Sequence, residues 1–351
     1  MAFAVYAQTP SDVKYKFTEA SDLNIIGKVL KETPNPYHRV DTCKYKGFTK
    51  SENIQVRCAS GLAVLFRTNS TTISVLGDYG YINNGVNTMG IALRGYDLYI
   101  KKDGEWLYAA SGVPNNPKEG KNHVLIKNMD NSEKECMLYL PIYSEMYSVK
   151  IGVEEGSEIE ALESPFKYRV TMFGSSFTQG ISISRSGMSY PAQFTRHTGI
   201  QLLSLGCSGN SKLQPYFADV LNDAEADAML FDAFSNPKAE MIHDRLFPFI
   251  EKIREVHPET PLIFMQTIYR ERRNFDLNTD KVESEKMHMA DSLMKIATKK
   301  YKNVYFIQTD TGENARETSA DGTHPTDMGY LGWSKSIEKQ VVKILRKHGL
   351  K

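Results

Sequence analysis

Residues 168–180 are Tyr168-Arg169-Val170-Thr171-Met172-Phe173-Gly174-Ser175-Ser176-Phe177-Thr178-Gln179-Gly180. The first six residues predict a buried strand, and a serine follows where that strand ends and the chain turns. In an α/β fold this is the place where a nucleophile is exposed. A second stretch, Asp321-Gly322-Thr323-His324-Pro325, has an aspartate three residues before a histidine. Together the two stretches contain the three residue types of a serine-hydrolase site.

Length and composition narrow the class of protein. The 351 residues are 41% hydrophobic and 24% charged, which is typical of a globular protein, and the length favours two domains. The net charge of +1 without a long basic run argues against nucleic acid or an anionic membrane as a partner. No run approaches the roughly 20 apolar residues of a membrane-spanning helix. A small neutral substrate is expected, and no pattern predicts the oligomeric state.

The four cysteines and residues 1–8 bear on metal binding and on where in or outside the cell the protein is found. The four cysteines form no CxxC pair and have no zinc-like spacing, so no structural metal is expected. Chemistry based on a serine nucleophile needs no cofactor, and none is expected. Cys43 and Cys58 could form a disulfide or remain reduced. Residues 1–8, Met1-Ala2-Phe3-Ala4-Val5-Tyr6-Ala7-Gln8, are interpreted as a signal-peptide remnant, with the apolar start of a cytosolic protein as the alternative. The first interpretation predicts export to the periplasm or the extracellular space.

Residues 9–164 have the pattern of an antiparallel β structure, because short alternating runs are separated by turn residues. The runs are 63–67, 72–76, 96–100, 106–109, 123–127, 136–140 and 147–151. Asp103-Gly104 lies between two of them and favours a tight hairpin, since both residues tolerate positive φ. We predict a β-sandwich, jelly-roll-like in arrangement, as an accessory domain.

Residues 165–351 alternate between apolar runs and helix-length segments. The runs at 168–173, 201–205, 228–233, 262–266 and 304–307 have the length of strands that are buried on both faces. This alternation predicts an α/β fold with a five-stranded parallel sheet between two layers of helices. Because ligands bind at the carboxyl ends of such strands, Ser176 and His324 are expected at the same edge of the sheet.

The chemistry needs a nucleophile, a base and an orienting group, which Ser176, His324 and Asp321 can supply. Attack on an ester carbonyl also builds an oxyanion, which requires hydrogen-bond donors that are fixed in advance. Gly209 and Asn236 follow the second and third strands and could supply a backbone N–H and a side-chain amide. Three of these residues also have a plainer interpretation. Asp321 and Gly209 could be turn residues, and Asn236 could start a loop.

These residues resemble the four blocks of the SGNH, or GDSL-type, hydrolase family, which is named for a serine, a glycine, an asparagine and a histidine. Ser176, Gly209, Asn236 and His324 stand in the family's order. The resemblance implies a three-layer, flavodoxin-like α/β/α catalytic domain and a reaction through an acyl-serine. It also implies an oxyanion hole made of the Ser176 N–H, the Gly209 N–H and the Asn236 amide.

Two positions differ from the family's usual pattern. Many members have an aspartate where this chain has Ser175, so two adjacent serines are candidate nucleophiles, and alignment to the family favours Ser176. Phe234-Ser235-Asn236-Pro237 stands in place of a Gly-x-Asn-Asp block. This change keeps the asparagine donor and suggests a reshaped pocket wall.

The first half is similar to a β-sandwich module that precedes certain bacterial SGNH hydrolases. The similarity rests on Gly95-Tyr96-Asp97-Leu98-Tyr99 and on residues 66–70 and 139–143. Asp97 is expected to hold a turn or a domain interface rather than contact substrate. The run 270–274, which contains three arginines, follows the fourth strand and is either a substrate contact or a solvated loop, so it receives no role.

The resemblance as a whole implies an exported serine esterase that removes small acyl groups, above all acetyl, from a small molecule or a carbohydrate. An acyltransferase could use the same residues. A carbohydrate-binding protein that has lost catalysis is the more distant alternative.

Overall fold

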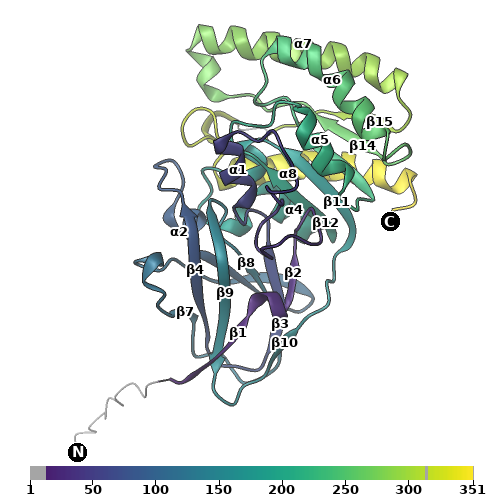
Figure 1. The fold of residues 1–351 in the computed structure, drawn as a ribbon. Helices are drawn as coiled ribbons and strands as arrows, with labels where there is room; N and C mark the ends of the chain where they lie inside the picture. The colour runs from purple at the N-terminus through teal and green to yellow at the C-terminus, as the bar shows by residue number, and fades with distance from the viewer. Residues whose placement is uncertain (1–12, 313–314, 351) are drawn as a thin grey trace, which may run out of the picture.

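The computed structural model describes residues 13–312 and 315–350, and it consists of two packed halves (Figure 1). Strands predominate up to Ala161, and strands alternate with helices from Lys167 onward. The predicted signal-peptide remnant lies outside the described residues, and the division of the chain between residues 164 and 165 stays a prediction. Among the described helices, none combines the length and apolar character needed to cross a membrane.

Two antiparallel sheets form the first half. One has the order β1 (Tyr15–Glu19), β9 (Ser144–Glu154), β4 (Ile73–Ile82) and β7 (His123–Ile126). The other has the order β10 (Ile159–Ala161), β3 (Ala63–Thr68), β8 (Lys134–Tyr139), β5 (Tyr96–Lys102) and β6 (Glu105–Gly112), with β2 (Asn24–Ile26) beside β3. Side chains from both sheets, including Phe66, Val75, Leu98 and Ile151, pack into one core. The predicted β-sandwich is therefore confirmed.

Short helical segments connect the sandwich strands. They are η1 (Ala20–Asp22), α1 (Lys50–Arg57), α2 (Gly90–Arg94) and η2 (Pro117–Glu119). Helix α1 starts at a capping box in which the Thr49 side chain and Glu52 each bind the other's backbone N–H. At the tip of the β5–β6 hairpin, Asp103 and Gly104 have φ values of 53° and 85°, as the sequence predicts.

The second half contains the predicted five-stranded parallel sheet. Its order is β12 (Ile200–Gly206), β11 (Lys167–Gly174), β13 (Ala228–Asp232), β14 (Leu262–Met265) and β15 (Val304–Ile307). Helices α5 (Pro215–Asn222), α6 (Ala239–Arg254) and α7 (Leu277–Lys300) cover one face. Helices α4 (Tyr190–Thr198) and α8 (Asp327–Lys347) cover the other, and together they make the expected α/β/α arrangement. The remaining segments are α3 (Ser176–Gln179), η3 (Ser186–Met188), η4 (Glu271–Asn274) and η5 (Ala315–Glu317).

The two halves share buried contacts. Val29, Val40 and Val56 from the first half join the core beneath α5 and α6. Arg39 is fully buried, and its guanidinium donates to the carbonyl oxygens of Ser204 and Gly206, at 3.2 and 2.9 Å. The sandwich therefore packs against the carboxyl end of β12, beside the edge of the sheet where ligands bind.

The structure bears on three residues that the sequence singled out, Asp97, Cys43 and Cys58. Asp97 is buried and forms an ion pair with Arg185 at 2.9 Å, so it links β5 to the segment before α4, as expected of an interface residue. Cys43 and Cys58 are both free, one exposed and the other buried. The disulfide that the sequence left open is therefore not formed.

Candidate active site

The strand-to-helix turn after β11 presents Ser176. Strand β11 ends at Gly174, Ser175 caps α3, and Ser176 is the first residue of that helix. The Ser175 hydroxyl donates to Asp232 Oδ2 at 2.6 Å and accepts the Phe177 N–H at 3.1 Å. Its hydroxyl is thus occupied in holding the turn, which leaves Ser176 as the serine that faces the histidine.

Ser176, His324 and Asp321 form one continuous chain of hydrogen bonds. The Ser176 Oγ lies 3.1 Å from His324 Nε2, and His324 Nδ1 lies 2.8 Å from Asp321 Oδ2. The pair of contacts implies a proton on His324 Nδ1, which leaves Nε2 free to accept the serine proton. A hydroxyl, an imidazole and a carboxylate in this order can carry out base-assisted nucleophilic attack. The structure thus brings together the three residues that the sequence selects.

Asp321 is held as a carboxylate by its neighbours. Oδ1 accepts the N–H groups of Thr323 and His324, at 3.0 and 2.8 Å, and Oδ2 accepts the Asn87 side-chain amide at 3.0 Å. Burial would raise the pKa of Asp321, but the hydrogen bonds from His324 and Asn87 outweigh burial and hold that pKa well below its usual range. Asp321 therefore stays charged and can stabilise a protonated His324.

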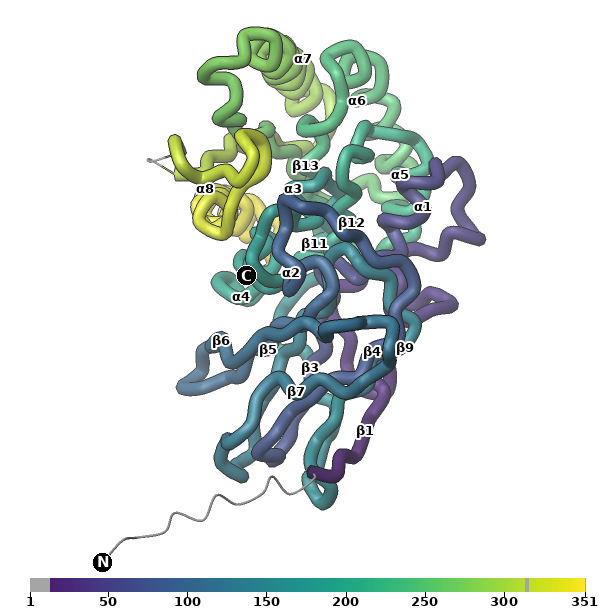
Figure 2. Tube along the Cα trace, turned by 90° about the vertical axis from the view of Figure 1, so that its left-hand side faces the viewer, coloured from purple at the N-terminus to yellow at the C-terminus, as the bar shows by residue number. Residues whose placement is uncertain are grey.

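Asn87 was not among the residues that the sequence selects. It lies between β4 and α2 in the sandwich, 234 positions before Asp321. The next residue, Thr88, accepts the Ser182 N–H at 2.8 Å through its side chain. Figure 2 shows the segment between β4 and α2 beside α3. The sandwich half therefore contributes directly to the site.

The loop that carries Asp321 and His324 is supported by the arginine-containing run. The Arg272 N–H donates to the Gly322 carbonyl at 2.8 Å, and its guanidinium donates to the Asp321 carbonyl at 3.0 Å. On the other side, the Phe177 ring packs edge-on against the His324 ring, with centroids 5.6 Å apart. These contacts hold the imidazole between the helix and the loop.

Three groups are available as donors at this edge. Within the described part of the chain, the backbone N–H groups of Ser176 and Gly209 form no hydrogen bond. Gly209 is exposed, has φ of 71° and has open space where a side chain would begin. Asn236 uses its Oδ1 to accept the Ser211 N–H at 3.2 Å, which leaves its NH₂ group to donate. These are the donors that the sequence selects for an oxyanion hole.

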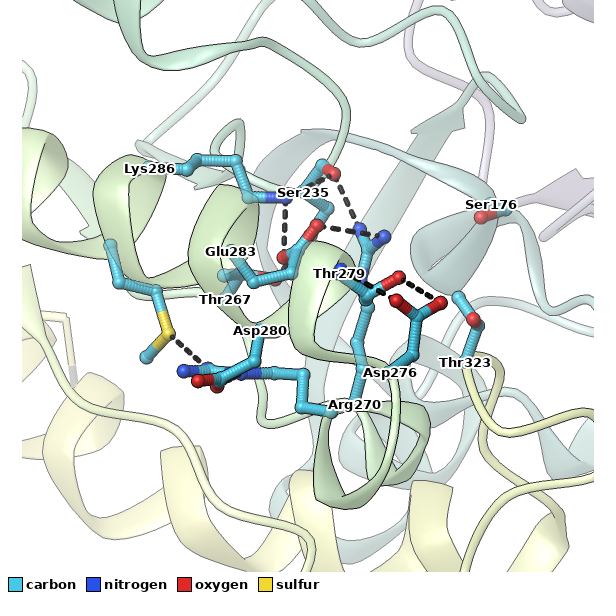
Figure 3. A network of polar contacts seen from close by, with 12 residues as sticks. Ser176, Ser235, Thr267, Arg270, Asp276, Thr279, Asp280, Glu283, Lys286 and Thr323 are labelled. Carbon is cyan, nitrogen blue, oxygen red and sulfur yellow. Dashed lines mark hydrogen bonds and ion pairs between the residues drawn. The ribbon is translucent and has the colours of Figure 1, made fainter.

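A buried cluster fixes the loop that carries Asn236. Figure 3 shows Arg270 and Lys286 converging on Ser235, and both donate to its carbonyl oxygen, at 2.6 and 3.1 Å. Glu283 forms an ion pair with Arg270 at 3.0 Å. Burial lowers the pKa of Lys286 to about 8, and the positive charge of Arg270 is the second cause of this shift. Two cations on the carbonyl before Asn236 restrict the direction in which that residue can point.

Asp232 was missed in the sequence because it lies within the apolar run 228–233. It is fully buried at the end of β13 and accepts the Ser175 N–H at 3.0 Å as well as the Ser175 hydroxyl. The hydroxyls of Thr178 and Ser235 also donate to it, at 3.0 and 2.6 Å. Burial raises the pKa of Asp232 despite these hydrogen bonds. An acidic residue at the end of a predicted buried strand is the signal that could have identified it.

Gln179 and Gly206, at the end of β12, connect the turn that carries Ser176 to the loop that carries Gly209. Gln179 accepts the Ser208 N–H at 2.9 Å and donates to the Ile142 carbonyl at 3.3 Å. A Cβ at Gly206 would lie 2.3 Å from the Gln179 nitrogen, so only glycine permits this close approach. In residues 13–312 and 315–350, no group of three or more His, Cys, Asp or Glu side chains is placed to hold a metal ion.

Two family models match the chain. The model of the GDSL-like lipase/acylhydrolase family matches residues 167–343, and a model described as the N-terminus of SGNH-hydrolase-type esterases matches residues 15–159. Together they cover both halves of the structure. A search of curated proteins found no match.

Solved structures share the arrangement of both halves. A protein from Bacteroides ovatus ATCC 8483, described as a GDSL-like lipase, is 37% identical, with a TM-score of 0.89 over 95% of this chain and 98% of that chain. A salicylyl-acyltransferase from a tetracycline biosynthetic pathway is 20% identical, with a TM-score of 0.70 over 94% of this chain and 97% of that chain. A family two carbohydrate esterase from Cellvibrio japonicus is 12% identical, with a TM-score of 0.60 over 95% of this chain and 98% of that chain. The last two likenesses show the fold alone.

Proposed function

Because the chain belongs to the GDSL-like lipase/acylhydrolase family, we propose that it is a serine esterase that hydrolyses small acyl esters. The observation that carries the proposal is the hydrogen-bonded series Ser176–His324–Asp321 at the carboxyl edge of the sheet. The family membership supports ester chemistry, and the series supplies the groups that such chemistry needs.

In the proposed reaction, His324 Nε2 takes the Ser176 proton while Ser176 Oγ forms a bond to the ester carbonyl carbon. Asp321 orients the imidazole and stabilises its positive charge. His324 then gives the proton to the leaving alcohol oxygen as the carbon–oxygen bond breaks, which leaves an acyl-serine. Water attacks the acyl-serine with His324 again as the base, and the acid and free Ser176 are released.

The oxyanion that forms in both steps requires preorganised donors. We assign this role to the Ser176 N–H, the Gly209 N–H and the Asn236 side-chain amide, which are unpaired within the described residues. Loss of one such donor typically costs about 3 to 4 kcal/mol of transition-state stabilisation. The cations on the Ser235 carbonyl support the assignment, because they restrain the residue next to Asn236.

The acyl group in the proposal is small, with acetyl as the expected case, and the alcohol part is a small molecule or a carbohydrate. Support for the carbohydrate is the fold shared with the carbohydrate esterase from Cellvibrio japonicus. The predicted export to the periplasm or beyond, which rests on the apolar character of residues 1–8, is kept as part of the same proposal.

An acyltransferase is the second candidate, since the fold is also that of a salicylyl-acyltransferase. An alcohol would then replace water as the acceptor from the acyl-serine. Product analysis in the presence of an added alcohol separates the two functions, because a transferase forms a new ester and a hydrolase releases only acid. The inactive binding protein is disfavoured, because the Ser176–His324–Asp321 series is complete.

The test is turnover of p-nitrophenyl acetate, butyrate and octanoate by the wild-type protein, Ser176→Ala and Ser175→Ala. We expect acetate to be the best substrate and Ser176→Ala to lower kcat by on the order of 10⁴-fold or more. Ser175→Ala is the comparison variant and should lose much less activity than Ser176→Ala, because the Ser175 hydroxyl supports the turn through Asp232 and does not face His324. Wild-type activity in Ser176→Ala, or its loss only in Ser175→Ala, contradicts the assignment.

A further inference from the structure

Arg270 belongs to the run for which the sequence left two interpretations, a substrate contact or a solvated loop. The surroundings of Arg270 fit neither. Its side chain is 17% exposed, its Nη1 lies 3.0 Å from Glu283 Oε1, and its Nη2 donates to the Ser235 carbonyl at 2.6 Å. The third nitrogen, Nε, is buried. The guanidinium is therefore bound to groups inside the protein.

The group that Arg270 holds is the peptide unit between Ser235 and Asn236. Lys286 of α7 donates to the same carbonyl oxygen at 3.1 Å, so two cations from different segments restrain one oxygen (Figure 3). A peptide unit is planar, so restraining its oxygen also restrains the Asn236 nitrogen. Pro237 acts from the other side, because a residue before proline is largely confined to extended conformations. The backbone of Asn236 is thus restrained on both sides.

The Asn236 side chain and the turn of the nucleophile are linked to the same unit. Asn236 Oδ1 accepts the Ser211 N–H at 3.2 Å, which sets the orientation of the amide and leaves its NH₂ group to donate. The Ser235 hydroxyl donates to Asp232, which also accepts the Ser175 hydroxyl. A shift of Ser235 would therefore move Asn236 relative to the turn that presents the nucleophile.

The cluster of Arg270, Lys286 and Glu283 is a poor source of stability. Removing cations from water is costly, and burial is the largest cause that lowers the pKa of both Arg270 and Lys286. Replacing buried ion pairs by well-packed apolar side chains is often neutral or stabilising. What the cluster supplies in this chain is a fixed direction for the Ser235 carbonyl.

We propose that Arg270 and Lys286 are positioning residues for the reaction, which act through the peptide unit between Ser235 and Asn236 on the direction of the Asn236 amide. The inference rests on the proposed esterase function and deepens it. Neither cation is expected to contact substrate. Their effect is expected in kcat rather than in KM, because an oxyanion donor binds the transition state more strongly than the substrate.

The experiment is a double-mutant cycle with p-nitrophenyl acetate as the substrate. Arg270→Met and Lys286→Met are each made in the wild-type protein and in Asn236→Ala. In the wild-type background we expect each change to lower kcat about tenfold or more with little change in KM, because small misplacements near the reacting atoms are costly. In the Asn236→Ala background the same changes should lower kcat less than about twofold, since the amide that they position is absent.

Arg273→Met is the matched control. Arg273 lies in the same turn, η4, its side chain is 9% exposed, and it binds Asp280 and Ser284 rather than Ser235. This change should leave kcat within about twofold of the starting protein in both backgrounds. Circular dichroism and urea unfolding check the folding of every variant. Lys286→Met keeps the test open if Arg270→Met does not fold, because Arg270 then still pairs with Glu283.

Three results overturn the inference while the esterase function stands. One is an unchanged kcat in the folded Arg270→Met or Lys286→Met protein. Another is a loss of equal size in the wild-type and Asn236→Ala backgrounds, which would show that the cations do not act through that amide. The third is a wild-type kcat in Asn236→Ala. Absence of wild-type activity on every ester, or activity that survives Ser176→Ala, is a failure of the proposed function itself.

Discussion

Two aspartates at the same edge of the sheet, Asp321 and Asp232, each accept four hydrogen bonds and have opposite pKa shifts. Asp321 accepts the His324 ring and amide nitrogens, the Thr323 N–H and the Asn87 amide, and its pKa is lowered. Asp232 accepts one N–H and three hydroxyls, and its pKa is raised. The number of hydrogen bonds therefore does not decide the direction of the pKa shift.

Burial and the kind of donor explain the difference. The Asp321 side chain is 30% exposed and faces an imidazole that can become positive, so water and His324 both favour the carboxylate. Asp232 is 1% exposed and its donors are uncharged, so desolvation dominates. Asp321 is suited to stabilise the positive charge that would form on His324 during a reaction. Asp232 is suited to hold the turn at Ser175 in place.

The largest expected effect tests the catalytic half of this comparison. Asp321→Asn should lower kcat for p-nitrophenyl acetate by about 10³ to 10⁴-fold with little change in KM, because an amide favours the wrong His324 tautomer. Steady-state kinetics measures this effect. A kcat within tenfold of wild type would show that His324 does not depend on Asp321.

The same variant has a stability signature whose sign follows from the lowered pKa. A lowered pKa stabilises the fold above the unfolded value, near 3.9, and that contribution is lost as the pH falls through the folded pKa. Asp321→Asn should therefore be less stable than wild type at pH 7, and the difference should shrink in strongly acidic solution. Urea unfolding at pH 7 and below pH 4 compares the two proteins.

A smaller effect is expected at Asn87, the sandwich residue that bonds Asp321. Asn87→Ala removes one of four donors, so we expect kcat to fall about tenfold, within the range for a hydrogen bond to a charged group. The melting temperature should stay near the wild-type value, because the change is partly exposed and local. Asn116→Ala is the control, since Asn116 is a sandwich asparagine that bonds only local partners. Equal activity in both variants would remove Asn87 from the site.

The smallest effect is expected for Asp232→Asn. The amide oxygen can accept from Ser175 and Thr178, and its NH₂ group can donate to Ser235 if that hydroxyl turns toward Thr267, 2.9 Å away. Below about pH 4, where the wild-type carboxyl is protonated in the folded protein, stability should thus change little. Asp232→Ala is the contrasting variant and should lose about 3 kcal/mol or more, because several buried donors are left unpaired.

The pH dependence of Asp232→Asn distinguishes the two aspartates. With a raised pKa, folded wild-type protein binds more protons than unfolded protein between the two pKa values, so wild-type stability falls as the pH rises through that window. The asparagine variant lacks this contribution and should gain on wild type as the pH rises above about 4. Urea unfolding at several pH values measures the difference between the two proteins. If the variant lost stability relative to wild type as the pH rises, burial would not destabilise the Asp232 carboxylate.

Much of the fold was predictable from local pattern. The five parallel strands overlap the apolar runs in the sequence, because strands buried on both faces need uninterrupted apolar residues. The Asp103-Gly104 turn was predictable because its φ values are properties of those two residues. Asp321 and His324 were selected by a spacing of three residues, and the structure joins them directly. Their catalytic roles stay predictions.

Other features depend on contacts between distant residues. Asp232 appeared in the sequence only as part of an apolar run, yet its partners are Ser175, Thr178 of α3 and Ser235 of the loop after β13. Ser175 and Ser176 are the same residue type, and only the resemblance to the family favoured Ser176. The positions of Asp232 and His324 separate the two serines physically. The pairing of Cys43 with Cys58 was open on spacing alone, and the fold leaves one exposed and the other buried.

Strands and the residue types of the site were predictable from the sequence, because these depend on periodicity and on spacing within a few residues, and the likeness of its separated blocks to known motifs indicated the family. Only the folded arrangement shows which serine faces the base, in which direction the pKa of each aspartate shifts, and that Asn87 reaches the site. The physical reason is that hydrogen bonding and desolvation act on groups that are close in space. In this chain the groups that set the state of Asp321 and Asp232 lie up to 234 positions away.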